Sequence, residues 1–282
     1  MKLIFGGVRG TNPVAHPDFL KFGGETTAVL IEGRGGEKIV IDAGTGLRAL
    51  GARLGSGTSG ASVLMLMTHY HLDHIMGLPS FSLLYDKQWN VAVAAPRRQG
   101  LEPGEIVRRM LAKPFWPVQL DQLHASLCFI TLPETSSKPK RHGGLEIRWC
   151  AVHHPDGCHA YRIDEPATRS ALVFATDIEW ALSTATERQA FYALCREPYP
   201  AQLLVMDGQF SRANIAKFKG WGHSAWEDGI AVAQKNGIRQ LRITHHAPQN
   251  NDTSLTKIEK AARRIWSGAA LAREGMEVEL HG

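Results

Sequence analysis

The sequence predicts an α/β fold with a sheet-rich core covered by helices. Short apolar or β-branched runs recur between turn residues, as strands buried in a sheet do. These runs lead in the first half of the chain and alternate with helical patterns in the second, an order that favours sheets covered by helices. No internal repeat or long low-complexity stretch divides the chain, and SSKPKRHGG (136–144) is typical of a surface hairpin loop. We therefore expect a single domain over residues 1–282.

The expected strands share an apolar character and are bounded by glycine, proline or polar residues. Several are apolar throughout, which indicates strands that are buried on both faces. In chain order, the expected strands cover residues 2–5, 26–32, 37–42, 62–67, 90–95, 126–132, 146–152, 159–163, 171–176, 202–207 and 240–244.

Two helical patterns lie in the second half of the chain. Residues 224–237 predict a helix with Ser224 as its N-terminal cap and Gly237 at its end. Residues 253–271 predict another, with Asp252 or Thr253 as cap. The apolar residues of this second pattern recur at helical spacing, namely Leu255, Ile258, Ala262 and Ile265.

The composition excludes several classes of protein. An apolar content of 44% with 21% charged residues is that of a globular chain. No run approaches the ~20 apolar residues of a membrane helix, and MKLIFGGVRG lacks the ~7–15-residue apolar region of a signal peptide, so we expect a cytoplasmic location. The four cysteines form no CxxC pair, which argues against a cysteine-rich zinc site and a disulfide scaffold. Cys128 and Cys150 lie in apolar runs and are expected to be buried.

The charge of the chain is mildly basic, with a formal net charge of +5. Basic residues gather at positions 97–98, 108–109, 138–142 and 263–264. Such clusters either attract phosphate-bearing substrates or form an ordinary solvated surface, and none resembles an arginine-rich nucleic-acid arm.

The strongest functional signal is the segment THYHLDH at residues 68–74. His69, His71, Asp73 and His74 directly follow an apolar run, and all four are potential metal ligands. Residues two apart in an extended segment point the same way, so His69 and His71 can converge on one ion. Asp73 and His74, beyond the turn, can face a second ion. The segment therefore predicts a metal site and not a set of unrelated histidines.

Two ions need more ligands than one segment offers. Adjacent residues in extended chain point apart, so only one histidine of a neighbouring pair can readily reach the site. The further candidates lie downstream, the last two groups again after apolar runs: His153 and His154, Asp177, and His245 and His246.

The order of these residues resembles the metallo-β-lactamase superfamily over nearly the whole chain. HxHxDH is followed by a lone histidine, an aspartate after a strand and a late histidine, and IDAGTG (41–46) resembles the family's aspartate-bearing turn. The segments GGVRGTNP and GGETTAVLIE, with Gly222-His223-Ser224 before the last ligand, are similar to the ribonuclease Z and cyclic-phosphodiesterase branch. The resemblance implies a four-layer αββα sandwich and two divalent metal ions, zinc in the first place, with manganese or iron as alternatives.

The resemblance also implies a ligand assignment. His154 is preferred to His153 because the branch places its ligand six residues before a Gly-Tyr pair, and here 160 − 154 = 6 leads to Ala160-Tyr161. His245 is preferred to His246 because it follows the strand-ending Thr244. The implied ligands are His69, His71 and His154 for the first metal, Asp73, His74 and His245 for the second, and Asp177 as a bridge.

Two such ions, about 3.5–4 Å apart, lower the pKa of a bridging water and make hydroxide available as a nucleophile near neutral pH. They also bind the oxygens of a phosphodiester. Asp73 or Asp177 could orient that water or accept its proton. By resemblance, His223 is the general acid for the leaving alkoxide or a donor to the phosphoryl oxygen, and its alternative is a turn residue before a helix.

The favoured function is therefore a metal-dependent hydrolase that acts as a phosphodiesterase on a small diester, cyclic or linear. A thiolate leaves without protonation, so His223 favours this function over a thioester or lactone hydrolase. An iron oxidoreductase in the same pocket and a non-hydrolytic metal-binding protein are the remaining alternatives.

The spacing of the ligands bears on the substrate. Ribonuclease Z enzymes typically insert a tRNA-gripping arm between the lone histidine and the bridging aspartate. Here that gap is 177 − 154 = 23 residues, and two expected strands already occupy it. We therefore do not expect pre-tRNA processing or a nucleic-acid partner, and a homodimer is expected from the resemblance alone.

Aromatic residues near the HxHxDH segment have two interpretations. They either wall a substrate pocket or cover the edge of the sheet, and Trp221, beside His223, is a further candidate for the pocket. The aromatic residues after the segment are Phe81, Tyr85, Trp89, Phe115 and Trp116.

Overall fold

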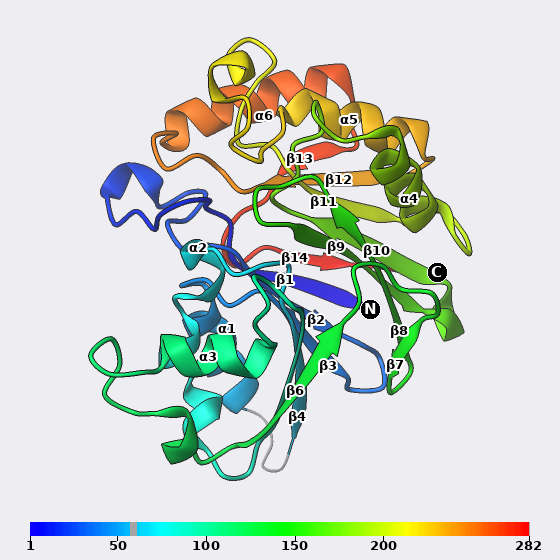
Figure 1. The fold of residues 1–282 in the computed structure, drawn as a ribbon. Helices are drawn as coiled ribbons and strands as arrows, with labels where there is room; N and C mark the ends of the chain where they lie inside the picture. Colours follow the sequence, from blue (N-terminus) through cyan, green and yellow to red (C-terminus); the bar gives the residue numbers. More distant parts are fainter. Residues whose placement is uncertain (57–60, 282) are drawn as a thin grey trace.

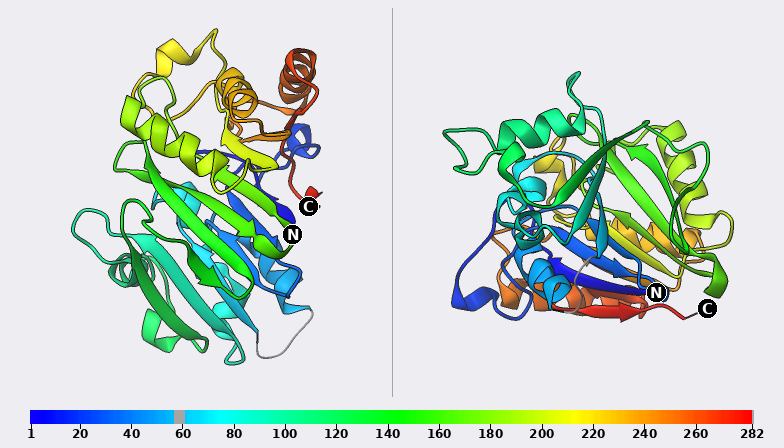
Figure 2. Two further views of the ribbon diagram at one scale, coloured as in Figure 1. Left: turned by 90° about the vertical axis from the view of Figure 1, so that its right-hand side faces the viewer. Right: turned by 90° about the horizontal axis from the view of Figure 1, so that it is seen from below.

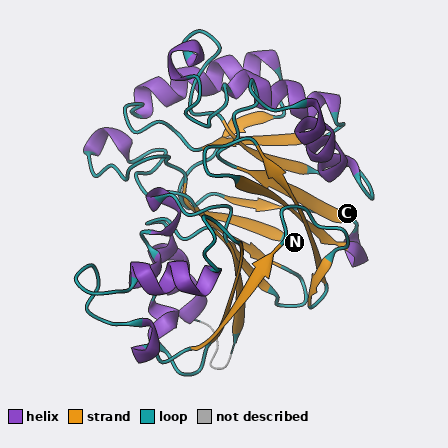
Figure 3. Cartoon of the chain, in the orientation of Figure 1, coloured by secondary structure: helices purple, strands orange, loops and turns teal. Residues whose placement is uncertain are grey.

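A computed structural model describes residues 1–56 and 61–281 and arranges them in four layers (Figures 1 and 3). Two seven-stranded sheets pack face to face, and helices cover their outer faces, which confirms the predicted α/β fold. The first sheet has the order β14 (Glu277–Glu279), β1 (Lys2–Gly7), β2 (Ala28–Glu32), β3 (Lys38–Ile41), β4 (Ser62–Leu66), β5 (Asn90–Pro96) and β6 (Ser126–Leu132). The second has the order β13 (Ala269–Leu271), β12 (Gln240–Thr244), β11 (Leu203–Asp207), β10 (Ser170–Ala175), β9 (Cys158–Glu165), β8 (Leu145–Val152) and β7 (Lys140–His142).

The helices form the two outer layers (Figure 3). α1 (Leu47–Gly55) and α3 (Pro103–Met110) pack on strands of the first sheet, and the short α2 (Leu72–Ile75) follows β4. α4 (Ala185–Arg196), α5 (Trp226–Lys235) and α6 (Asp252–Ile265) pack on the second. Within the described ranges 1–56 and 61–281, no helix has both the length and the apolar character needed to cross a membrane.

Alternation along the central strands builds three apolar layers. In β2, Val29 and Ile31 pack between the sheets, whereas Leu30 packs under α1. In β11, Leu203 and Val205 face the first sheet, while alternate residues face the outer helices. Because successive side chains point to opposite faces, a strand that is covered on both sides is apolar throughout. This explains why these strands show no polar alternation in the sequence.

The directions of the strands determine which loops lie at the same edge of each sheet. β3, β4, β5 and β6 run parallel to one another in the first sheet, and β10, β11, β12 and β13 do so in the second. The carboxyl ends of parallel strands lie at the same edge of a sheet. Loops that follow β3, β4, β10, β11 and β12 can therefore meet where the two sheets adjoin.

Some elements were not predicted from the sequence. The N-terminal strand β1 pairs antiparallel with β14, which is the last strand of the chain (Figure 2). The first sheet therefore contains strands from both ends of the sequence. β14 and the helices α1, α3 and α4 lack the long periodic patterns of α5 and α6. The hairpin predicted at 136–144 contains β7, which pairs with β8 across a turn at Gly143 and Gly144.

Four local predictions were wrong. The helix predicted over 253–271 ends at Ile265, and residues 269–271 form β13 at the edge of the second sheet instead. The cap of α6 is Asn251, whose side chain accepts a hydrogen bond from the backbone N–H of Ser254, and not Asp252 or Thr253. Ser224 does not cap α5, because its hydroxyl donates to the Ile178 carbonyl instead. Cys128 is exposed because β6 is the edge strand of its sheet, where one face is only partly covered.

Candidate metal centre

The predicted ligands lie at the ends of strands or directly after them. His69 and His71 lie in the loop that follows β4, and Asp73 and His74 lie in α2. His154 follows β8, Asp177 follows β10 and His245 follows β12. The fold thus brings all seven predicted ligands to one place, although they come from both sheets.

The backbone turns sharply at three of these strand ends. Asp42 has φ of 62°, Asp177 has φ of 55° and His245 has φ of 61°, which is the left-handed region that side chains other than glycine rarely adopt. Such conformations concentrate at functional sites, where the surrounding structure enforces them. Here the turn directs each side chain back toward the junction of the two sheets.

One group of ligand atoms consists of three imidazoles. His69, His71 and His154 each offer a nitrogen, and these atoms lie within 4.8 Å of one another. The Nε2 atom of His154 is 3.1 Å from the Nδ1 atom of His71. His69 and His154 are buried, whereas 43% of the His71 side chain is exposed, so this part of the site faces solvent.

A second group lies deeper. Asp73 Oδ2 is 3.3 Å from His74 Nε2 and 3.2 Å from His245 Nε2, and the two imidazole nitrogens are 3.2 Å apart. All three side chains are buried. A carboxylate and two imidazoles whose donor atoms converge at these distances form a set of ligands that zinc accepts.

Asp177 lies between the two groups. Its Oδ1 atom is 3.9 Å from His69 Nε2 and 3.8 Å from His154 Nε2. Its Oδ2 atom is 3.0 Å from His74 Nε2 and 3.2 Å from His245 Nε2. Each oxygen therefore faces a different group, which is the arrangement that a bridging carboxylate requires.

The far nitrogens of the imidazoles are held by other groups. The Nδ1 atom of His74 is 2.8 Å from Asp42 Oδ2, that of His69 is 3.0 Å from Thr68 Oγ1, and that of His245 is 3.2 Å from Gln209 Oε1. Thr68 in turn donates its backbone N–H and its hydroxyl to Asp42. Because Nδ1 is engaged in each of these three imidazoles, Nε2 is the nitrogen that faces the cluster.

The two remaining histidines lie outside the groups. The Nδ1 atom of His153 is 3.7 Å from Glu187, and 37% of its side chain is exposed. His246 is buried and donates its Nε2 proton to the Ala272 carbonyl. The structure thus places His154 and His245 in the cluster and turns their neighbours away, as expected for adjacent residues in extended chain.

Two buried atoms of this cluster have no hydrogen-bond partner, namely His69 Nε2 and Asp177 Oδ2. Asp177 Oδ2 lies at ion-pair distance from two imidazoles but not in hydrogen-bonding geometry. A buried polar atom without a partner costs about 1–3 kcal/mol. Both atoms are donors of the kind that divalent metals bind, so the residues present fit the metal ions that the fold implies.

The pKa shifts of the clustered side chains also support a metal site. Burial lowers the pKa of His69 well below its ordinary value, so this imidazole stays neutral and keeps a lone pair. Burial also opposes the charged form of His74, but the carboxylates of Asp177, Asp73 and Asp42 outweigh it and hold the pKa of His74 well above its ordinary value. The neighbouring imidazoles in turn hold the pKa of Asp177 well below its usual range, against the effect of burial. The carboxylates of Asp73 and Asp177 therefore remain anionic and require positive charge nearby, which divalent cations supply.

His223 lies at the edge of the cluster. Its Nδ1 atom is 2.8 Å from Asp207 Oδ2 and 3.8 Å from Asp177 Oδ1. Burial opposes the charged imidazole, but Asp207, and then Asp177 and Asp73, raise the pKa of His223 to about 9. His223 is therefore a proton-bearing group beside the ligands, with Nδ1 engaged and Nε2 left to donate.

Sequence reasoning missed Asp207. This carboxylate ends β11, is buried, and accepts the backbone N–H of Ser224 and of Asp177 as well as the His223 proton. The donor atoms of Asp177, Asp207, His223 and His245 also lie within 4.8 Å of one another. The available signal was the position of Asp207 at the end of an apolar strand between the strands that lead to Asp177 and His245.

Glu179, Thr11 and Gln209 were also missed as supporting residues. Glu179 is buried and accepts the backbone N–H of Gly220 and Gly222, at 2.8 Å each. The carbonyl of Gly222 accepts the Nδ1 proton of His154 at 2.9 Å. Thr11 donates its backbone N–H to Asp73, and Gln209 donates to the Thr11 hydroxyl. Isolated residues of these types carry no pattern that a sequence could reveal.

Gly222 is required at its position. Its φ is 86°, and a Cβ atom there would lie 2.0 Å from the Nδ1 atom of His154. Only glycine allows both this backbone conformation and the close approach of the imidazole. Gly222, in the Gly-His-Ser segment, therefore allows the His154 imidazole, which follows β8, to approach the backbone closely.

The aromatic residues after HxHxDH mostly cover the sheet. Phe81 and Trp89 are fully buried in the layer under the helices, and Tyr85 donates its hydroxyl to the Pro79 carbonyl. The indole N–H of Trp116 donates to the Tyr85 hydroxyl. Only Phe115 is strongly exposed in this set. The interpretation as a packed cover is thus supported for the buried members.

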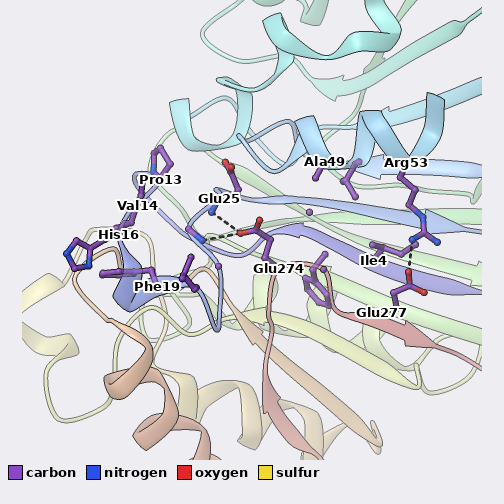
Figure 4. Close-up of a pocket in the computed structure, with 18 residues that line it drawn as sticks. Ile4, Pro13, Val14, His16, Phe19, Glu25, Ala49, Arg53, Glu274 and Glu277 are labelled. Atoms are coloured by element: carbon purple, nitrogen blue, oxygen red, sulfur yellow. Dashed lines mark hydrogen bonds and ion pairs between the residues drawn. The ribbon is translucent and has the colours of Figure 1, made fainter. Parts of the chain in front are cut away.

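A separate cavity of about 650 Å³ lies against the N-terminal loop (Figure 4). The residues labelled there come from β1, the loop between β1 and β2, α1, β14 and the segment before β14, and Glu274 accepts the backbone N–H of Gly24. Arg53, on its wall, is paired with Glu277. The cavity is lined by none of the predicted ligands, so the chemistry of the cluster does not take place in it.

Comparisons with known proteins agree with this geometry. A family model described as a beta-lactamase superfamily domain matches residues 37–246. A protein named Ribonuclease Z, from Lachnospira eligens, is 23% identical to this chain over 87% of the chain and 89% of its own length.

Two solved structures share the fold. The metallo-beta-lactamase fold protein YhfI from Bacillus subtilis has a TM-score of 0.70 and 18% identity, over 99% of both chains. A diphosphatase from the PhnP family has a TM-score of 0.68 and 16% identity, over 99% of this chain and 97% of that one. At these identities the likeness is one of architecture, namely two sheets covered by helices.

Proposed function

Because the chain belongs to the beta-lactamase superfamily and is a metal-dependent hydrolase of the branch that includes ribonuclease Z, we propose that it cleaves small phosphodiesters at a centre of two divalent metal ions. Zinc is the metal that the donor set favours, since it consists of imidazole and carboxylate groups only. We further propose that residues 1–282 form a single catalytic domain.

The observation that carries the proposal is the position of Asp177. Its two oxygens face two separate groups of donor atoms, which supports a shared ligand between two ions. When bound, two such ions would polarise the phosphoryl group and supply an activated water near neutral pH. The residues that would hold them are His69, His71 and His154 for one ion, Asp73, His74 and His245 for the other, and Asp177 for both.

Side chains of the protein would orient the attacking water and protonate the leaving group. Asp73 and Asp177 would orient the attacking water, because both remain anionic inside the cluster. His223 would give its Nε2 proton to the leaving oxygen, and Asp207 would hold that imidazole in place and favour its protonated form. A proton donor at this position is of use to an alkoxide leaving group, which supports a phosphodiester as substrate over a thioester.

The second candidate function is RNA processing, which the names of relatives such as that from Lachnospira eligens favour. Against it, β9 and β10 occupy most of the stretch between His154 and Asp177, and residues 166–169 form a short connection between the two strands. No segment of that stretch extends from the sheet to grip a folded RNA. We therefore place small diesters first.

The test begins with metal content, followed by hydrolysis of bis-p-nitrophenyl phosphate by the zinc- or manganese-loaded protein. Two metals per chain with diester turnover is the expected result. Two metals without turnover would move the assignment to thioesters and lactones, and cleavage of pre-tRNA in preference to small diesters would favour RNA processing. Fewer than one metal per chain after reconstitution would contradict the dinuclear centre.

Removal of metal is expected to destabilise the fold. A ligand that binds only the folded state at 100 times its Kd contributes about 2.7 kcal/mol. For a chain of this size, that corresponds to a fall in Tm of about 5–10 °C per site. Differential scanning calorimetry before and after chelation measures this change, with re-addition of zinc as the control. A chelated protein that melts at the same temperature would show that the ions do not bind where the buried ligands are.

Asp42→Asn is expected to weaken metal binding without unfolding the protein. The amide keeps the shape of the side chain and tolerates the left-handed backbone, but it cannot serve both Thr68 and His74 as the carboxylate does. Loss of such an orienting partner typically costs 10–100-fold in metal affinity. Competition with a fluorescent zinc chelator gives the Kd, and the Tm of the metal-free variant serves as a folding control. An unchanged Kd would remove Asp42 from the support of His74.

A further inference from the structure

Three aromatic rings lead outward from His223, along the loop between β11 and α5 (yellow in Figure 1). The ring of Phe210 is 6.0 Å from that of His223. Phe218 stacks on Phe210, with centroids 4.1 Å apart and an interplanar angle of 5°. The indole of Trp221 meets Phe218 edge-on, at 5.2 Å. The rings thus form a continuous aromatic wall that begins at the proton donor.

The wall ends in solvent. Phe210 is buried, whereas Trp221 is 61% exposed. Indole is a large apolar surface, and leaving it in water forfeits the stabilisation that burial would give. Phe218 contacts the indole of Trp221, and the exposed part of the indole remains available to a ligand.

The backbone around Trp221 is fixed. Glu179 accepts the N–H groups of Gly220 and Gly222, the residues on either side of Trp221. The carbonyl of Gly222 holds His154. The indole is therefore mounted on a clamped segment that contacts one predicted metal ligand directly and precedes the proton donor by two residues. A side chain held in this way loses little conformational freedom when it binds a ligand.

The charges of the same loop suit an anionic ligand. Lys217 and Lys219 are both exposed. Arg212, by contrast, is paired with Asp228 and is less available. Two exposed lysines within four residues of an exposed indole combine attraction for phosphate with a surface on which planar rings stack, as in sites that bind nucleotides.

We propose that Trp221 determines specificity, by stacking on a planar aromatic ring in the arm of the diester that lies on the His223 side of the scissile bond. The substrates selected in this way are nucleotide or aryl diesters and not alkyl diesters. This rests on the proposed function for the location of the phosphoryl group. It adds a recognition element that acts on the organic part of the substrate and not on the reacting atoms.

The experiment compares two ligands that share a phosphate and a ribose but differ in the base. Isothermal titration calorimetry on the metal-loaded protein measures the Kd of adenosine 5′-monophosphate and of ribose 5-phosphate. We expect the nucleotide to bind about tenfold more tightly, a difference of about 1.4 kcal/mol, through its base. Trp221→Ala should remove this preference and leave ribose 5-phosphate unchanged, whereas Trp221→Phe should retain most of it.

Ile265→Ala is the matched control. Ile265 is also an exposed apolar side chain, at 57%, but it ends the 14-residue helix α6, whose first turn follows the His245 loop, so it lies about 20 Å along that helix from the site. This variant should bind both ligands as wild type does. Equal affinity of wild type for the two ligands, or a base preference that survives Trp221→Ala, would overturn the assignment. A protein that prefers the nucleotide through Trp221 but hydrolyses no diester would instead contradict the proposed function alone.

Discussion

Asp177→Asn should abolish diester hydrolysis, with a fall in kcat/KM of at least about 10³-fold, equivalent to about 4 kcal/mol of transition-state stabilisation. The reason is geometric. Asp177 Oδ1 faces the donor atoms of His69 and His154, and Oδ2 faces those of His74 and His245, so one substitution weakens both ends of the centre. An amide offers a single neutral oxygen where two anionic ones are needed.

The measurement has two parts, metal content by mass spectrometry and turnover of bis-p-nitrophenyl phosphate. The variant should retain no more than one metal per chain. Asp121→Asn is the matched control, because Asp121 is an exposed carboxylate in the short helical turn at 120–122 and belongs to none of the groups of donor atoms. Its activity should stay within about threefold of wild type. Two metals in Asp177→Asn, with activity preserved, would mean that Asp177 bridges nothing.

His223→Ala should separate substrates by their leaving groups. For a diester with an alkyl leaving group, we expect kcat to fall by about 10²–10⁴-fold, which is the usual contribution of a positioned general acid. For bis-p-nitrophenyl phosphate, whose phenolate leaves without a proton, the fall should be less than about tenfold. The structural basis is the bond from His223 to Asp207, which leaves Nε2 as the donating atom.

Metal content decides between two roles for His223. Its donor atom also lies within 4.8 Å of those of Asp177, Asp207 and His245, so it could in geometric terms contribute to a metal site. Two metals in the variant, with the loss confined to poor leaving groups, would support the proton donor. Loss of one metal and an equal fall for both substrates would make His223 a ligand. Asp207→Asn should show the same leaving-group pattern as His223→Ala, but weaker.

The ligands that could be predicted from the sequence alone are those that lie within a few residues of one another in the chain. His69, His71, Asp73 and His74 are close enough to form a pattern by themselves, and they do lie together in the structure. Asp177 and His245 were predicted because each follows an apolar strand, and their parallel strands end at one edge. His154 rested on the resemblance and a six-residue step, and it lies in the cluster while His153 does not.

The supporting residues could not be predicted, because their roles arise from contacts between distant segments. Asp207 and Glu179 act on the Gly-His-Ser loop, and Thr11 reaches Asp73 from the other end of the chain. Errors such as Cys128 have the same origin. Its run is as apolar as those of the central strands, but β6 occupies an edge, and neighbours in space decide burial.

The pairing of β1 with β14 has a consequence for how the centre comes into being. Lys2 is paired with Glu279, and the candidate ligands run from His69 to His245, so both the sheet and the site depend on contacts between segments that are synthesised far apart in time. Contacts of such long sequence separation are slow to form. The HxHxDH segment therefore leaves the ribosome before the segments that carry the other candidate ligands. The complete set of ligands exists only once both sheets have formed, so metal binding at the full centre would follow the packing of the two sheets.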